Sequence, residues 1–200
     1  MPRARFTLAD LHADPAFAAR LRSPAAELLD GEVVVQPLPS AAVVAAVVQL
    51  ASSLDERAVG LRVGVRAAVA AWPRDLLRPE VSVSLPGVPT CVRPAPPATS
   101  LALAVLVVEH VDVAQARLRR YALAGIPETW VLAPTDGIGA AYRDAQAGRY
   151  RRRELLLPGE PCAPREAPWL QVIPLLRRQA EAGGTTASAA AGTTAAEAAA

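Results

Sequence analysis

Runs of apolar residues, separated by polar turns, divide the chain into helices and strands. Residues 40–57 begin with Ser40, a residue type that caps helices, and their length and alanine content predict a buried helix. Residues 104–132 start as a run of branched apolar residues and continue as an arginine-rich helix from about Asp112 to Ala124. The apolar run has no polar face, which is typical of a central strand covered on both sides. The other predicted elements are a short helix at 14–23 capped by Asp14, a hairpin turning at Asp30-Gly31, one or two strands in 60–72, a strand in 79–87, a strand at 128–134, a hairpin turning near Ala147-Gly148, and a closing strand with a short helix at 168–179.

The order of these elements predicts an α/β fold with a mixed central β-sheet flanked by helices. Residues 104–132 read as a strand, a crossover helix ending before Gly125 and a parallel strand. Tyr121 and Trp130 are expected to pack this helix onto the sheet. We expect an N-terminal segment at 1–14, one domain at 15–178, and an alanine- and threonine-rich tail at 179–200 that has too few large apolar residues to fold.

Composition and charge narrow the function only slightly. The 200 residues include 21 basic and 19 acidic side chains, and every basic residue is an arginine. The resulting net charge of +2 does not by itself indicate a nucleic-acid binder, because such proteins usually carry a concentrated basic face. The chain has no signal-peptide core and no apolar run of about 18 residues, so we expect a cytoplasmic protein without a membrane partner.

Most common catalytic signatures are missing from the chain. The sequence contains no phosphate-binding loop, dinucleotide fingerprint, zinc-protease motif or serine-hydrolase elbow. Cys91 and Cys162 are isolated from each other and from any His cluster, which favours reduced structural thiols over a zinc site.

Two glutamates stand out because each is attached to an apolar β segment that is otherwise poor in acids. Glu80 precedes a valine-rich strand, and Glu109 follows the long apolar run. If the two strands are neighbours, their carboxylates can meet at one end of the sheet and bind Mg²⁺ through oxygen. Such an ion activates water and stabilises charge on a phosphate under attack. The alternative is that both side chains are strand-end residues that point into solvent.

Four stretches together resemble a known family. They are "AELLDGEVVVQPLPS", "RPEVSVS", "AVLVVEHV" and "RLRRYALAGIPETWVL", and in this order they are similar to the Uma-type restriction endonucleases, a branch of the PD-(D/E)XK nuclease superfamily. The resemblance covers about residues 15–178. Its most specific part is "YALAGIPETWVL", in which a helix end, a glycine turn, a Pro-Glu pair and a tryptophan-bearing strand follow one another.

The resemblance implies a restriction-endonuclease-like core that hydrolyses phosphodiester bonds of DNA with Mg²⁺ or Mn²⁺. The family's proline-acid pair matches Pro79 and Glu80, and its strand glutamate matches Glu109. The position of the family's helix lysine holds Arg117, and Glu27 matches an acidic position that could approach the metal. The resemblance, with exposed sheet edges, also makes a homodimer a reasonable expectation.

The departures from the family pattern affect the catalytic residues. Only eight positions separate Glu109 from Arg117, so the usual loop is shortened, and Val111 stands where a basic residue often follows the strand glutamate. Val43 replaces a histidine that is common in the family. Arginine can stabilise phosphate charge, but it stays protonated and cannot act as a general base. Three hypotheses remain: a metal-dependent endonuclease, a catalytically inactive nuclease fold that binds DNA or a protein partner, or a structural domain that shares only its topology with the family.

Other polar residues allow both a functional and a structural interpretation. His110 could act as a base only if the strand ends or bulges there, since it otherwise points away from Glu109. The stretch "RYRRRELLL" carries Arg149, Arg151, Arg152 and Arg153, which could contact phosphates. The alternative is that these arginines are solvated charges on an edge strand that deter sheet-to-sheet association.

Overall fold

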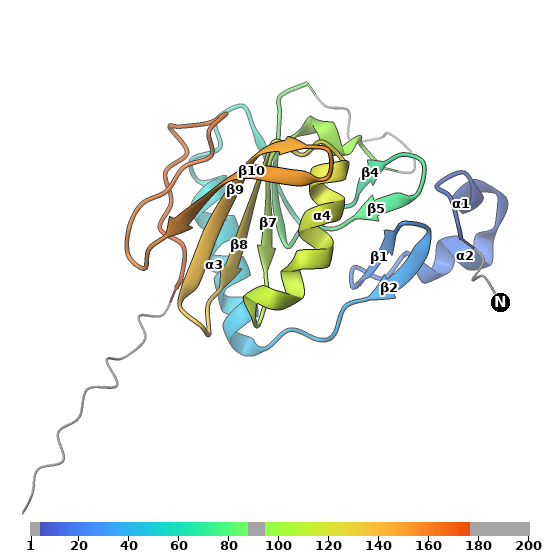
Figure 1. Ribbon diagram of the computed structural model, residues 1–200, viewed down its shortest axis with the longest axis horizontal. Coiled ribbons are helices and arrows are strands. Elements are labelled where there is room, and N and C mark those ends of the chain that lie inside the picture. Colours follow the sequence, from blue (N-terminus) through green and yellow to red (C-terminus); the bar gives the residue numbers. More distant parts are fainter. Residues whose placement is uncertain (1–4, 88–94, 177–200) are drawn as a thin grey trace, which may run out of the picture.

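A six-stranded mixed sheet forms the centre of the computed structural model, which describes residues 5–87 and 95–176 (Figure 1). In spatial order its strands are β10 (Arg149–Leu156), β9 (Ile138–Gln146), β8 (Glu128–Ala133), β7 (Leu101–Val107), β6 (Val81–Ser84) and β3 (Arg62–Val65). Strands β7 and β8 are parallel, and the other neighbouring pairs are antiparallel. All of β7 is buried, which confirms the predicted central strand. The predicted tail at 179–200 and Cys91 lie outside the described residues.

Two helices cover opposite faces of this sheet, as the mixed α/β prediction requires (Figure 1). Helix α3 (Ala41–Asp55) begins at Ser40, whose Oγ accepts a hydrogen bond from the backbone N–H of Val43 at 3.3 Å. Helix α4 (Gln115–Leu123) is the crossover between β7 and β8. The predicted start at Asp112 is wrong, because a tighter 3₁₀ turn at Val111–Ala114 first reverses the chain after β7.

A smaller antiparallel sheet packs beside the large one (Figure 1). The predicted hairpin at Asp30-Gly31 is confirmed, with both residues at positive φ, 51° and 79°. The expected strand region at 60–72 divides between the two sheets, and a further strand at residues 75–77 had no sequence signal. The strands are β2 (Glu32–Val35), β1 (Ala26–Leu29), β5 (Asp75–Leu77) and β4 (Val69–Ala71), and the helices preceding them are α1 (Asp10–Ala13) and α2 (Pro15–Arg20), the latter capped by Asp14 as predicted.

Alternation along β8 sends its two large side chains to different layers. Tyr121 of α4 packs on the face that receives Val131, as predicted for a crossover helix. Trp130 points to the opposite face, where it packs with residues of α3. The expectation that Trp130 contacts the crossover helix is therefore wrong, because successive strand residues alternate between faces.

The chain after β10 covers the α3 side of the sheet without regular structure. Leu170, Val172 and Leu176 are buried there, but the predicted closing strand is reduced to a single bridge between Cys162 and Val172. Several prolines in this segment lack the N–H that a strand ladder needs. The short helix predicted at its end extends beyond the described residues. Among the described helices, none has the length and apolar character needed to cross a membrane.

Candidate functional site

The predicted site residues Glu80, Glu109 and Arg117 line one cavity of about 240 Å³. Strands β6 and β7 are antiparallel neighbours, with Val81 paired to Val105. Glu80, just before β6, and Glu109, just after β7, therefore lie at the same end of the sheet. The segment that leads into α3 forms an apolar part of the cavity's rim, which includes Leu38 and Pro39.

Arg117 lies between two buried carboxylates. Its Nη1 donates to both carboxylate oxygens of Glu80 at 3.1 Å. On the other side, its Nη2 donates to Glu27 Oε1 at 3.2 Å, and its Nε lies 3.1 Å from Glu27 Oε2. Glu27 is fully buried, and Glu80 and Arg117 are almost so. One guanidinium thus bridges two acidic side chains away from solvent.

Helix α4 and the small sheet position the partners of this bridge. Tyr121 lies one turn after Arg117 on the buried face of α4, and its hydroxyl donates to Glu27 Oε1 at 3.3 Å. Glu27 belongs to β1, and it also accepts the backbone N–H of Arg78 at 2.7 Å and the Gln36 amide at 3.1 Å. Each Glu27 oxygen therefore has a donor besides Arg117.

Burial away from water affects the pKa values of the charged groups in this cluster. Burial raises the pKa of Glu80, although the guanidiniums of Arg117 and Arg66 oppose this shift. Burial alone would lower the pKa of Arg117, but Tyr121, Glu80 and Glu27 outweigh it and hold that pKa above its ordinary value. Arg117 is therefore a fixed cation. Arg66 approaches Glu80 from the cavity side, with Nη1 at 3.6 Å from Oε1.

Glu109 has a structural partner of its own. Its Oε1 accepts the backbone N–H of Ser40 at 2.8 Å, and its Oε2 accepts the Ser40 hydroxyl at 2.9 Å. Ser40 is the N-cap of α3, so the carboxylate lies near the positive end of that helix. Both oxygens of Glu109 are engaged in holding the start of the helix against the end of β7.

The donor set does not fit a divalent cation in this arrangement. Within residues 5–87 and 95–176, no group of three or more His, Cys, Asp or Glu side chains is placed to hold a metal ion. The carboxylates of Glu27 and Glu80 face Arg117, whereas that of Glu109 faces Ser40. Mg²⁺ requires several oxygen ligands in octahedral geometry, and here the guanidinium supplies the positive charge between the acids.

His110 and Cys162 lie apart from this cluster. The His110 side chain is 68% exposed, and its Nδ1 lies 3.1 Å from Asp136 Oδ1, so it faces solvent. Cys162 is a half-buried free thiol whose pKa is raised by burial to about 12, which makes it an unreactive structural residue at neutral pH. Sequence reasoning did not find Tyr121, Arg78 or Gln36 as partners of Glu27, because only the tertiary fold brings them to it.

Replacing Arg117 with methionine should destabilise the protein by about 3–5 kcal/mol, because Glu27 and Glu80 then remain buried without their shared cation. The free energy of unfolding, measured by urea denaturation, checks this. Arg119→Met is the matched control: Arg119 is exposed on the same helix, so its replacement should change stability by no more than about 0.5 kcal/mol. Equal effects of the two substitutions would contradict a structural role for the bridge.

Glu80→Gln should alter the dependence of stability on pH. The folded chain holds the Glu80 proton more tightly than the unfolded chain, since burial raises the pKa above its ordinary value of 4.5. The wild type should therefore lose stability relative to Glu80→Gln as pH rises from below 4.5 through the raised pKa. Urea denaturation of both proteins across this range measures the difference, and a constant difference would show that Glu80 does not titrate in this way.

Comparison with known proteins supports the fold. No family model matches the chain, and no curated protein matches its sequence. Among solved structures, it is similar to that of a protein described as a "putative nuclease belonging to DUF820" from Anabaena variabilis. The TM-score is 0.64 at 13% identity, over 85% of this chain and 95% of the other. At that identity the likeness concerns the fold alone, and the chain therefore has a nuclease-like α/β fold.

Proposed function

We propose that this chain is a nuclease-fold protein that binds nucleic acid without metal-dependent cleavage. The observation that carries the proposal is the position of Arg117, whose guanidinium bridges Glu80 and Glu27 where a nuclease of this fold would need free carboxylates. A permanent cation at this point neutralises the acids that would otherwise attract a metal ion.

The remaining chemistry of the cavity also supports an inactive site. Hydrolysis of a phosphodiester needs an activated water and stabilisation of the developing charge. Arg117 can stabilise charge but cannot accept a proton, because the guanidinium stays protonated in proteins. The chain contains no lysine to take the role of base, and both oxygens of Glu109 hold Ser40.

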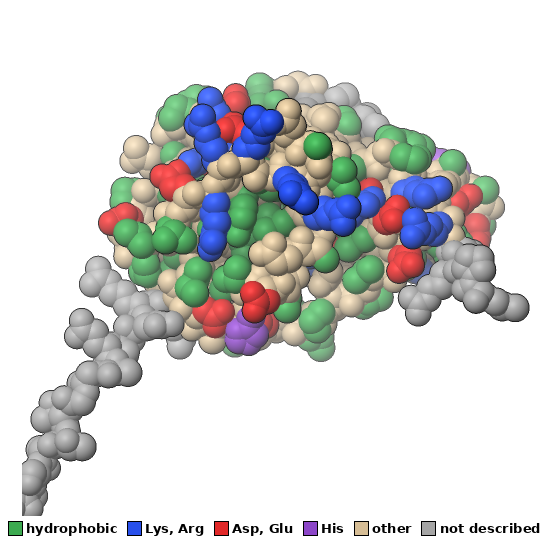
Figure 2. Space-filling view, viewed as in Figure 1, with side chains coloured by type: hydrophobic (Ala, Val, Ile, Leu, Met, Phe, Trp, Pro, Cys, Tyr) green, Lys and Arg blue, Asp and Glu red, His purple; other side chains and the backbone are tan. Residues whose placement is uncertain are grey.

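Binding of nucleic acid is the part of nuclease function that needs no metal. It requires cations at the surface that face phosphate groups. The chain supplies only arginines for this purpose, and Figure 2 shows basic side chains at several places on the face that carries the β9–β10 hairpin. The similarity to a protein described as a nuclease supports nucleic acid as the partner.

A metal-dependent endonuclease is the second candidate. It is favoured by the shared cavity of Glu80 and Glu109, which lie at one end of the sheet as that activity requires. In this candidate, a Mg²⁺ or Mn²⁺ ion would have to displace Arg117 from Glu80, and the two glutamates would become its ligands.

Incubation of supercoiled plasmid with the purified protein in Mg²⁺ or Mn²⁺ distinguishes the two candidates. We expect retarded migration of intact plasmid, with retardation that weakens as salt rises. A Glu80→Gln, Glu109→Gln variant, prepared identically and shown to be folded by circular dichroism, is the control and should behave in the same way. Cleavage by the wild type that is lost in the variant would establish the endonuclease, and no retardation at low salt would refute nucleic-acid binding.

A further inference from the structure

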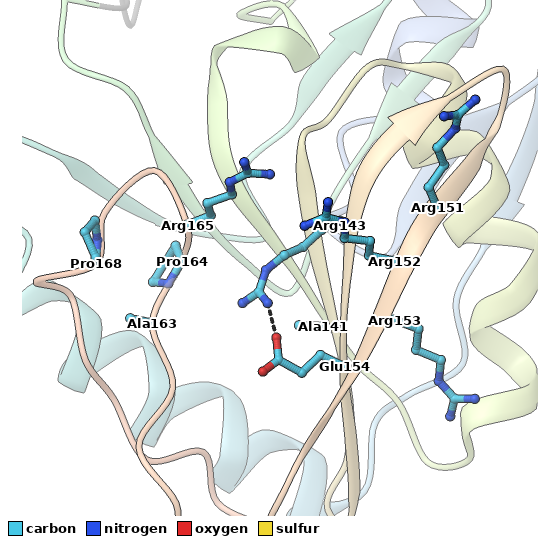
Figure 3. A pocket seen from close by; sticks show the side chains of 10 residues that line it. All are labelled: Ala141, Arg143, Arg151, Arg152, Arg153, Glu154, Ala163, Pro164, Arg165 and Pro168. Carbon is cyan, nitrogen blue, oxygen red and sulfur yellow. Dashed lines mark hydrogen bonds and ion pairs between the residues drawn. The ribbon is translucent and has the colours of Figure 1, made fainter.

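An open groove lined by arginines lies between the β9–β10 hairpin and residues 163–168 (Figure 3). Its volume is about 770 Å³, and none of its lining residues belongs to the cavity that contains Glu80. Apart from alanines and prolines, the lining consists of Glu154 and five arginines, which are Arg143, Arg151, Arg152, Arg153 and Arg165.

Three of the five arginines, Arg143, Arg152 and Arg165, form ion pairs in this groove. Asp144 is shared by two guanidiniums, with Arg152 Nε and Arg165 Nη1 each at 2.9 Å from one of its oxygens. Arg143 pairs with both Glu128 and Glu154. The side chains of Arg151 and Arg153 point away from residues 163–168, and the guanidinium of Arg153 lies over the Tyr142 ring at 5.9 Å from its centre (Figure 3). The pair Arg152 and Arg165 therefore carries one positive charge more than the carboxylate that the two share.

The shared carboxylate arranges the two guanidiniums for a ligand. Arg152 and Arg165 come from different segments, and they point toward each other across the groove (Figure 3). Each uses one nitrogen for Asp144, which leaves other N–H groups on each fork. Because Asp144 holds the forks in place, less side-chain entropy is lost when a doubly hydrogen-bonded oxyanion binds.

Protection of a sheet edge does not account for all of these residues. Strand β10 is an edge of the large sheet, and charges on it deter pairing with another chain. Arg165, however, lies in the segment after β10, and Arg143 lies on the inner neighbour β9. Neither residue is needed to protect the edge, but both line the groove.

We propose that this groove binds the phosphodiester backbone of a double-stranded nucleic acid. This inference rests on the proposed function and gives it a location. Arginine forks match phosphate oxygens in geometry and charge. The ten lining residues include no aromatic side chain, so the groove lacks the stacking platforms of single-strand binders. Contacts to phosphate carry no base information, so we expect recognition that is independent of base sequence.

The test measures binding of fluorescently labelled 20-base-pair DNA and RNA duplexes of one sequence by anisotropy, at several salt concentrations. The groove variant is Arg152→Gln, Arg165→Gln, which removes the two guanidiniums that share Asp144. The control variant is Arg22→Gln, Arg62→Gln, which removes two exposed charges outside the groove. All three proteins should unfold at the same urea concentration. The comparison of DNA with RNA identifies which duplex is the better ligand.

The wild type and the control should bind alike, whereas the groove variant should bind about tenfold more weakly or worse. Its plot of log affinity against log salt should be shallower by about 2, since about one phosphate contact is lost per arginine. Equal binding by groove variant and wild type would overturn the groove as the site but leave the proposed function standing. Absence of binding by the wild type at low salt would overturn both, and the arginines would then act only in edge protection.

Discussion

A single buried guanidinium joins three parts of this molecule. Arg117 projects from α4, the crossover helix, and contacts Glu80 at the start of β6 and Glu27 on β1 of the small sheet. Each of these side chains is buried, where an unpaired charge is strongly unfavourable. The ion pairs of this one guanidinium therefore connect the helix, the large sheet and the small sheet, in addition to the apolar contacts between them.

Under the proposed function, this interaction is also the reason that the fold binds nucleic acid without metal-dependent cleavage. A metal site in such a fold depends on carboxylates that are free to bind a cation, but here one cation is built into the chain. Glu109 also has a structural contact, because its carboxylate accepts hydrogen bonds from Ser40, the N-cap of α3. At these positions the contacts of Glu80 and Glu109 stabilise the fold.

Local signals in the sequence were sufficient for much of the fold. Ser40 marks the start of α3, Asp30-Gly31 forms the first hairpin, and the apolar run at β7 lies in the middle of the sheet. The predictions were wrong where the structure depends on contacts between residues that are far apart in the chain. The face of β8 that receives Trp130 depends on strand register, and the prolines after β10 prevent the closing strand that its apolar residues suggested.

The candidate site was predictable only in part for the same reason. The sequence pointed to Glu80 and Glu109 by their positions beside strands, and to Arg117 and Glu27 by the family resemblance, but it did not indicate the contacts that these residues make. Glu27 lies 90 residues before Arg117 in the chain, and nothing in either local sequence indicates that the two form an ion pair. Tyr121 lies one helical turn after Arg117, so the sequence places both on the same face of a helix. Its hydrogen bond to Glu27, however, depends on how the small sheet packs beside α4.

The most direct test of the central claim is a titration of Mn²⁺ into the wild type and Glu80→Gln, with free Mn²⁺ followed by electron paramagnetic resonance. If Arg117 occupies the place of a metal ion, the two proteins should leave the same amount of Mn²⁺ free throughout the titration. A binding site present in the wild type and absent from Glu80→Gln would contradict this account, because Glu80 would then be available as a metal ligand.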